Sequence, residues 1–270
     1  MKPGVLALVL GLLLGSGALK AEIKEEVVGY LDGEHHLRGY LYFDDKFAGV
    51  RPGVLVAHEW WGLNDYARQR AKMLAELGYA AFALDMYGDD LVTEHADQAK
   101  AWMKQVSGNL PAWQQRARRG YDQLANHRMV DPKRIAAIGY CFGGSTVMQL
   151  AYSGLPLSGV VSFHGSLPVA TAEQAAQVAA PVLVFHGEAD KFVPAERVSE
   201  FKAALQTADV DWQFVSYSRA QHSFTNPAAS QLGIENIAYS EAADRRSWQV
   251  LQVFFNEIFS NTIEQTPPQE

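Results

Sequence analysis

The chain has 270 residues, of which 48% are hydrophobic and 11% aromatic, so it can bury the core of one large α/β domain or of two small ones. Its formal net charge is −7, and its longest basic cluster is Arg116-Ala117-Arg118-Arg119. Nucleic-acid-binding surfaces are basic, so this charge disfavours a nucleic-acid partner.

The first residues have the pattern of a secretory signal. Lys2 precedes an apolar run from Gly4 to Leu14, and small residues follow it. The run is shorter than the ~20 residues that span a bilayer, so a retained membrane anchor is the weaker alternative. We expect cleavage after Ala18 or Ala21, with residues 1–21 as the signal peptide. The mature protein would be secreted or periplasmic, with no stable membrane insertion.

After the signal, two extended runs flank the turn Leu31-Asp32-Gly33-Glu34, which predicts an antiparallel hairpin of residues 22–30 and 37–43. Short apolar strands and amphipathic helices then alternate. The expected strands are 53–57, 80–84, 134–138, 159–163, 182–185 and 212–217. The expected helices are 67–77, about 92–106, 111–127, 194–205 and 245–259. No composition break marks a linker, so we expect one domain over residues 22–260 and a flexible tail over 261–270.

This alternation predicts an α/β fold, with a mainly parallel sheet and helices on both faces. Ligands of such sheets bind at the carboxyl ends of the strands. The residues that carry chemistry are therefore expected where strands end.

Cys141 is the only cysteine, and it lies in Gly139-Tyr140-Cys141-Phe142-Gly143-Gly144, directly after the expected strand 134–138. This is the nucleophile-elbow pattern with a thiol in place of serine. The sharp turn needs glycines two residues on either side of the nucleophile, where a Cβ would collide with backbone. The next helix would present its positive end to the thiol and favour the thiolate. The alternative is a buried structural cysteine, which is the commonest fate of a free thiol.

Two later strands lead into residues that can complete a triad. Strand 182–185 leads into Asp190, and strand 212–217 leads into His222. A thiol nucleophile needs a base, here His222, and an acid that orients this base, here Asp190. Taken singly, Asp190 could cap the helix 194–205 and His222 could be a surface residue. Jointly, the order nucleophile, acid, histidine is that of α/β-hydrolases and favours the triad.

Acyl transfer also needs N–H donors for the developing oxyanion. We expect these to be the backbone N–H groups of Phe142, directly after the nucleophile, and of Trp60, in the loop 57–62. His58-Glu59 does not begin a zinc motif, because Gly62 occupies the second histidine position of H-E-x-x-H. The sequence contains neither a P-loop nor a dinucleotide fingerprint. We therefore expect no cofactor and no metal.

Together these motifs resemble the dienelactone hydrolase family of α/β-hydrolases, from about Pro52 to Phe255. The resemblance is carried by Glu59 in its loop, Asp85-Met86-Tyr87, the hexapeptide around Cys141, Asp190-Lys191-Phe192-Val193-Pro194 and His222-Ser223-Phe224. It implies the α/β-hydrolase fold and a Cys141–His222–Asp190 triad that hydrolyses an ester or lactone through a thioester acyl-enzyme. It also implies that Glu59 contacts the resting thiol and helps to deprotonate it when substrate arrives. By charge alone, a nearby carboxylate would oppose ionisation of a thiol.

The chain departs from the family at two arginines that hold the carboxylate of dienelactones. The resemblance places one shortly after Tyr87 and one four residues after His222, where this chain has Gly88-Asp89-Asp90 and Asn226. We therefore expect neutral esters or lactones to be preferred, with Asp89 and Asp90 repelling anions. The residues that could replace the missing charges from another direction are Arg68, Arg219 and Lys191.

The sequence thus predicts an exported α/β-hydrolase that cleaves a small ester or lactone. The expected aromatic substrate pocket comprises Trp60, Trp61, Tyr87, Phe142 and Phe224, each of which could equally be a core residue. A thioesterase or peptidase on the same scaffold is the alternative among enzymes. A catalytically silent ligand-binding protein is the alternative from another class, although it would not need an intact triad, elbow and oxyanion loop. The sequence gives no indication of the oligomeric state.

Overall fold

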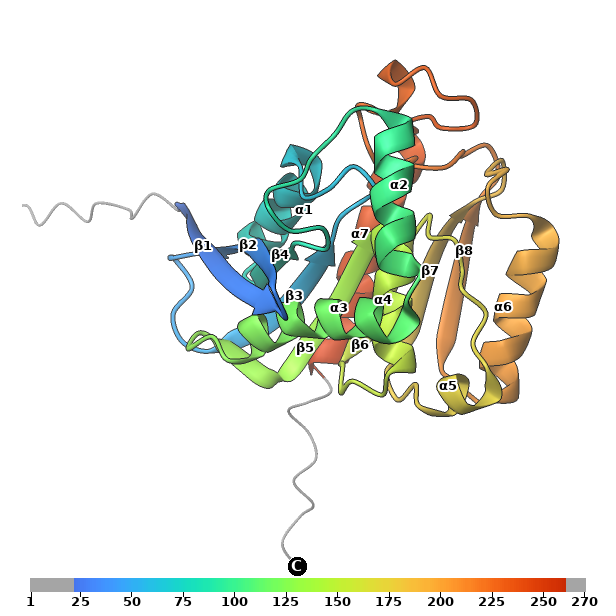
Figure 1. Cartoon of the computed structure of the whole chain (residues 1–270). Helices are drawn as coiled ribbons and strands as arrows, with labels where there is room; N and C mark the ends of the chain where they lie inside the picture. Colours follow the sequence, from blue (N-terminus) through green and yellow to red (C-terminus); the bar gives the residue numbers. More distant parts are fainter. Residues whose placement is uncertain (1–21, 261–270) are drawn as a thin grey trace, which may run out of the picture.

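The computed structural model describes residues 22–260, so the predicted signal peptide (1–21) and tail (261–270) lie outside the described residues. One eight-stranded sheet runs through this part of the chain in the order β1-β2-β4-β3-β5-β6-β7-β8 (Figure 1). Strands β3 to β8 are mutually parallel, and the hairpin β1–β2 joins them through an antiparallel pairing of β2 with β4.

The strands are β1 (Ile23–Asp32), β2 (His35–Asp44), β3 (Arg51–Ala57), β4 (Ala80–Leu84), β5 (Val130–Tyr140), β6 (Gly159–Phe163), β7 (Val182–Gly187) and β8 (Trp212–Tyr217). The helices are α1 (Asp65–Glu76), α2 (Ala96–Ser107), α3 (Leu110–Ala125), α4 (Phe142–Tyr152), α5 (Ala172–Ala176), α6 (Ala195–Thr207) and α7 (Glu241–Ser260), with a 3-10 turn at Ala229–Gln231. The predicted hairpin is confirmed, and each predicted strand and helix has a counterpart.

Strand β5 begins four residues before the expected position 134. Val130 and Asp131 pair with Arg51 and Pro52 of β3, and a register shift then separates them from the main run of pairs. An irregular pairing of this kind has no apolar pattern of its own, so periodicity finds only the buried part of the strand.

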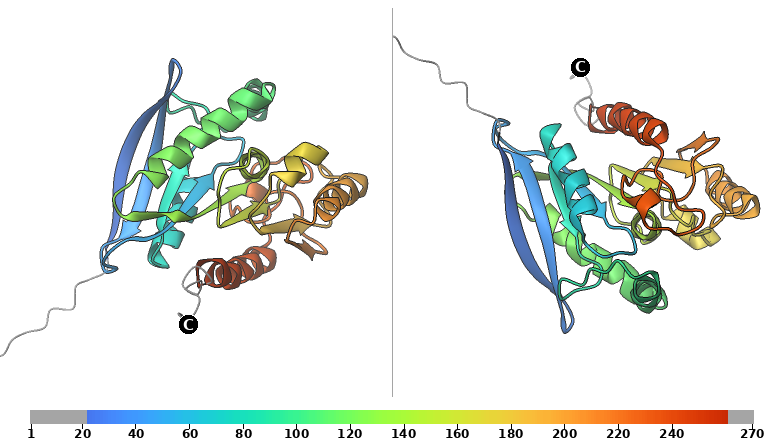
Figure 2. Two further views of the ribbon diagram at one scale, coloured as in Figure 1. Left: turned by 90° about the horizontal axis from the view of Figure 1, so that it is seen from below. Right: turned by 90° about the horizontal axis from the view of Figure 1, so that it is seen from above.

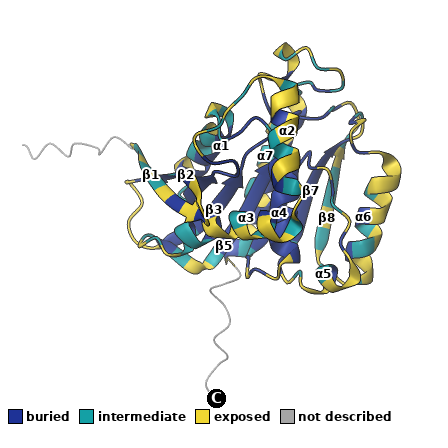
Figure 3. Cartoon of the chain, in the orientation of Figure 1, coloured by how far each residue is buried: buried dark blue, intermediate teal, exposed yellow. Residues whose placement is uncertain are grey.

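Helices cover both faces of the sheet (Figure 2). On one face, side chains of α2 to α6, such as Trp113 and Phe201, pack in one apolar cluster. On the other face, α1 and α7 contribute residues such as Leu74 and Phe255 to a second cluster. The central strands between these layers are buried (Figure 3), as the continuous apolar runs of parallel strands require. The expected α/β-hydrolase architecture is confirmed.

The loops that carry the predicted chemistry follow β3, β5, β7 and β8. These strands are parallel, and in the sheet only β6 separates β5 from β7. Their carboxyl ends therefore share one edge of the sheet, which brings the four loops together. Within residues 22–260, no helix is long and apolar enough to cross a membrane.

Candidate active site

The nucleophile elbow lies between β5 and α4, with Cys141 directly before the helix. Cys141 has φ 54° and ψ −113°, a backbone conformation that is unusual for a side-chain-bearing residue. A Cβ added to Gly139 would lie 2.0 Å from Gly143 O, and one added to Gly143 would lie 2.1 Å from Ala57 O. Only glycine therefore fits at these two positions, as the elbow pattern predicts.

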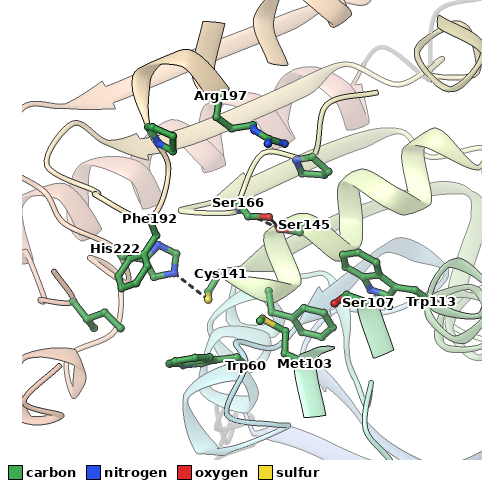
Figure 4. Close-up of a pocket in the computed structure, with 14 residues that line it drawn as sticks. Trp60, Met103, Ser107, Trp113, Cys141, Ser145, Ser166, Phe192, Arg197 and His222 are labelled. Carbon is green, nitrogen blue, oxygen red and sulfur yellow. Dashed lines mark hydrogen bonds between the residues drawn. The ribbon is translucent and has the colours of Figure 1, made fainter. Parts of the chain in front are cut away.

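Three side chains from separate loops form one hydrogen-bonded line, of which Figure 4 shows the contact between Cys141 and His222. Cys141 Sγ lies 3.0 Å from His222 Nε2, and His222 Nδ1 lies 2.7 Å from Asp190 Oδ2. The other oxygen, Asp190 Oδ1, accepts a hydrogen bond from the Phe192 N–H at 2.9 Å. Asp190 therefore does not cap α6, whose N-cap is Pro194. His222 is buried rather than on the surface, so the structure excludes both alternative interpretations.

The surroundings of His222 favour its protonated form. Burial alone would lower the pKa of His222, but the charge on Cys141 and the hydrogen bonds to Asp190 and Cys141 together raise it well above its usual value. The ring of Phe192 packs edge-on against the imidazole with 5.2 Å between centroids. The arrangement therefore favours a proton on His222, next to the Cys141 sulfur.

A cavity of about 520 Å³ opens beside Cys141. Its apolar lining consists of Trp60, Met103, Trp113, Phe142, Pro168, Phe192, Pro194 and Ile237. Its other lining residues, besides Cys141 and His222, are Ser107, Ser145, Ser166 and Arg197. The apolar lining includes Trp60 and Phe142, the two residues expected to form the oxyanion hole. Met103 and Trp113 come from α2 and α3, and no sequence motif marks them.

Three residues expected in the substrate pocket do not line this cavity. Trp61, Tyr87 and Phe224 are buried instead. The Tyr87 hydroxyl donates to the Trp60 carbonyl at 2.9 Å, and the Trp61 ring packs edge-on against that of Trp60. The prediction was wrong because position in a loop does not show which way an aromatic side chain turns.

His58, in the loop after β3, makes hydrogen bonds through both ring nitrogens. Its Nε2 accepts from the Met86 N–H at 3.2 Å, so Nδ1 carries the proton and donates to the Glu59 carbonyl at 2.5 Å. Burial lowers the pKa of His58, which keeps the ring neutral. Among the described residues, no cluster of three or more histidine, cysteine or acidic side chains has the geometry of a metal site.

Glu59 is buried directly under the histidine loop. Its Oε1 accepts from Ser223 Oγ at 2.7 Å, and its Oε2 accepts from Asn226 Nδ2 at 2.6 Å. Burial raises the pKa of Glu59, against the opposing effect of these two donors and of the nearby charges on His222 and Arg70. In this conformation the carboxylate bonds to neighbours of His222, and the contact with the thiol stays a prediction.

The two departures from the family motif lie away from the Cys141 cavity. Asp90 pairs with Arg38 at 2.6 Å, and Asn226 holds Glu59 while lining a separate cavity. Asp89 lines a third cavity beside the hairpin. The expected repulsion of anionic substrates by Asp89 and Asp90 therefore has no structural basis.

Arg197 is a charged side chain in the cavity lining that was not expected from the sequence. It lies in the first turn of α6 and reaches toward the cavity (Figure 4). Its Nε lies 3.7 Å from Glu200 Oε2, and its side chain is half-exposed. The residues considered as replacement cations, Arg68, Arg219 and Lys191, do not line this cavity.

His164, directly after β6, is also not among the residues expected from the sequence. Its ring is buried, and its Nδ1 accepts a hydrogen bond from the Cys141 N–H at 3.1 Å. The rule that functional residues follow strand ends would have found it, because His164 directly follows Phe163, the last residue of β6.

Comparisons with known proteins show a family match and closely similar folds. A model of the dienelactone hydrolase family matches residues 37–259. The crystal structure of a dienelactone hydrolase-like promiscuous phosphotriesterase from metagenomic libraries is 38% identical, with a TM-score of 0.85 over 87% of this chain and 98% of that one. The structure m3DLH has 40% identity, the same TM-score of 0.85 and coverage of 87% and 98%. Protein usf of Aquifex pyrophilus is 27% identical over 225 residues, which are 82% of this chain and 93% of that protein.

Proposed function

Because the chain belongs to the dienelactone hydrolase family, we propose that it hydrolyses a small ester or lactone with Cys141 as the nucleophile. His222 acts as the base. Asp190 orients the imidazole of His222 and stabilises its protonated form. The observation that carries the proposal is the line of contacts from Cys141 Sγ to His222 Nε2 at 3.0 Å and from His222 Nδ1 to Asp190 Oδ2 at 2.7 Å. These are the distances at which a base can take the proton of a nucleophile.

In the first half of the proposed reaction, the Cys141 sulfur attacks the substrate carbonyl carbon while the thiol proton resides on His222 Nε2. The carbonyl oxygen becomes an oxyanion, which accepts hydrogen bonds from the N–H groups of Phe142 and Trp60. The bond to the leaving oxygen then breaks, and His222 gives its proton to that oxygen. The acyl group is left as a thioester on Cys141.

In the second half, His222 takes a proton from water, and the hydroxide oxygen attacks the thioester carbonyl. The carbon–sulfur bond breaks, the acid product leaves, and the sulfur again shares a proton with His222. Asp190 favours the protonated imidazole in both halves. No cofactor takes part in these steps.

Glu59 is proposed to tune the ionisation of the Cys141–His222 pair. Support comes from its burial and from its hydrogen bond to Ser223, the residue directly after His222. The largely apolar lining of the cavity supports a substrate with an apolar acyl or alcohol part. We also propose export of the protein, which N-terminal sequencing of the mature chain would test.

The test is a panel of chromogenic esters, lactones, thioesters, a peptide and a phosphotriester, assayed with the wild type beside Cys141→Ala. We expect turnover of an ester or lactone by the wild type and none by the variant. Preference for the thioester or the peptide would favour the alternative enzymes on this scaffold. Binding of panel compounds without any turnover would favour the silent ligand-binding protein.

A further inference from the structure

His164 connects two loops that the proposed reaction must keep in register. On one side, its Nδ1 accepts from the Cys141 N–H at 3.1 Å, in the nucleophile elbow. On the other, its Nε2 lies 2.7 Å from Thr225 Oγ1, three residues after His222. Since Nδ1 accepts, the ring proton is on Nε2, which donates to the threonine hydroxyl. One buried imidazole thus joins the loop of the nucleophile to the loop of the base.

The ring is suited to this arrangement only when neutral. Burial, together with the nearby positive charges of His222 and Arg70, holds the pKa of His164 well below its usual value. The Nδ1 lone pair is therefore available to the Cys141 N–H wherever the protein is folded near neutral pH. The proposed chemistry does not use His164 as an acid or a base.

The surrounding contacts leave the His164 ring little freedom. It packs edge-on against the rings of His222 and Phe224, with centroid distances of 5.4 Å and 5.2 Å. Thr225 is itself fixed, because its hydroxyl lies 2.6 Å from the Tyr66 hydroxyl and its carbonyl accepts from Arg70. The backbone of His164 has φ 40°, in the left-handed region that side-chain-bearing residues seldom adopt.

We propose that His164 is a positioning residue that aligns the Cys141 sulfur with His222 Nε2. The inference rests on the proposed function of Cys141 and His222. The ring acts through the two loops, because its hydrogen bonds go to the Cys141 N–H and to Thr225 rather than to the Cys141 sulfur or the His222 nitrogens. Its loss would let the elbow and the histidine loop shift against each other.

A second hydrogen bond limits the expected effect. The Cys141 N–H also donates to the Phe163 carbonyl at 3.0 Å, a main-chain contact that no side-chain substitution removes. The elbow would therefore still form without the imidazole. We expect a loss of about tenfold in kcat, the scale of one hydrogen bond, rather than the loss caused by removing the base.

Three variants separate the parts of this arrangement. His164→Phe keeps a ring but removes both nitrogens. His164→Asn places an oxygen acceptor close to the position of Nδ1, and asparagine tolerates a positive φ. Thr225→Val keeps the side-chain shape and removes the acceptor of the Nε2–H bond. Each is compared with the wild type in kcat, KM, thermal midpoint and rate of Cys141 alkylation by iodoacetamide against pH.

We expect His164→Phe to lower kcat about tenfold with KM within about twofold, and to slow alkylation near neutral pH. At high pH, where a thiol ionises without help from a base, its alkylation rate should approach that of the wild type. His164→Asn should recover most of both losses, and Thr225→Val should fall between the two.

Wild-type kcat and alkylation in His164→Phe would overturn the inference. So would folded His164→Asn that performs no better than His164→Phe, because the acceptor would then be irrelevant. If His164→Phe does not fold, unchanged kcat and alkylation in Thr225→Val would contradict the bridge. A wild-type protein that cleaves no ester would refute the proposed function. The inference about His164 could still be tested in that case, because alkylation of Cys141 needs no substrate.

Discussion

At the scale of single residues, His222 contacts Cys141 directly, whereas Asp190 contacts only His222 of these two. The proposed mechanism therefore gives the two residues different roles. In the proposed mechanism, His222 moves the proton, whereas Asp190 orients the ring and favours its charged form. We predict that His222→Ala lowers kcat roughly 10⁴-fold or more. The loss of kcat in Asp190→Asn should be smaller than this by a factor of about ten or more. Single-turnover kinetics on one ester would check the order, and a larger loss for Asp190→Asn would contradict these roles.

Glu59 is a buried acid whose ionisation works against folding. Burial raises the pKa of Glu59 in the folded protein above the ordinary 4.5. The stability linked to this group is therefore fully present below pH 4.5 and is lost as pH rises through the raised folded value. Relative to the wild type, Glu59→Gln should gain unfolding free energy as pH rises across this window.

Urea unfolding of both proteins at several pH values measures that difference. If the difference in unfolding free energy between the two proteins is the same at all pH values, the pKa of Glu59 is not raised by folding. The same two proteins test the proposed functional role, because Glu59→Gln should also change the pH profile of Cys141 alkylation. Identical alkylation profiles would leave Glu59 with a structural role only.

Arg197 is the cation that an anionic substrate would meet in the cavity. The residue is half-exposed and already close to Glu200, so its contribution is on the scale of a surface ion pair. We predict that Arg197→Met lowers kcat/KM about two- to fivefold for a carboxylated lactone and leaves its neutral analogue unchanged. An equal loss for both substrates would indicate a packing effect, and no loss for either would remove Arg197 from substrate recognition.

At the scale of elements, the strand–elbow–helix unit depends on close backbone contact. A methyl group on Gly143 would lie 2.1 Å from Ala57 O, so β3 and α4 would have to separate. We predict that Gly143→Ala destabilises the protein by about 2–3 kcal/mol and lowers activity sharply. Gly29→Ala on β1 is the matched control, because nothing lies within 4 Å of its new Cβ. Equal unfolding midpoints for the two variants would contradict this account of the elbow.

The sequence predicts elements well where their pattern is strong. The hairpin and the buried strands have alternating or continuous apolar runs between turn residues, and the structure has them within a few residues of the expected bounds. The short helix α5 has five residues and too little periodicity to detect. The sequence also did not predict that Met103 and Trp113 line the cavity, because they reach it through the tertiary packing of α2 and α3.

At the scale of the whole molecule, the order of the parallel strands decides which loops meet. Residues at strand ends share one edge of the sheet, so Cys141, Asp190 and His222 could be grouped from chain order alone. The orientation of Tyr87 and Phe224 depends on packing that no local pattern encodes. The same holds for Asp90 and Asn226, whose partners come from distant segments. The sequence therefore predicted the three side chains of the proposed triad better than the residues that line the cavity.

In the proposed mechanism the acyl group passes through a thioester on Cys141, and intact-protein mass spectrometry would detect that thioester. An activated ester is mixed with the wild type and with Cys141→Ala, and the reaction is quenched in acid. We predict that the wild type gains the mass of one acyl group, which hydroxylamine removes, and that the variant gains none. Equal acylation of the variant, or turnover by Cys141→Ala at the wild-type rate, would contradict a thioester on Cys141.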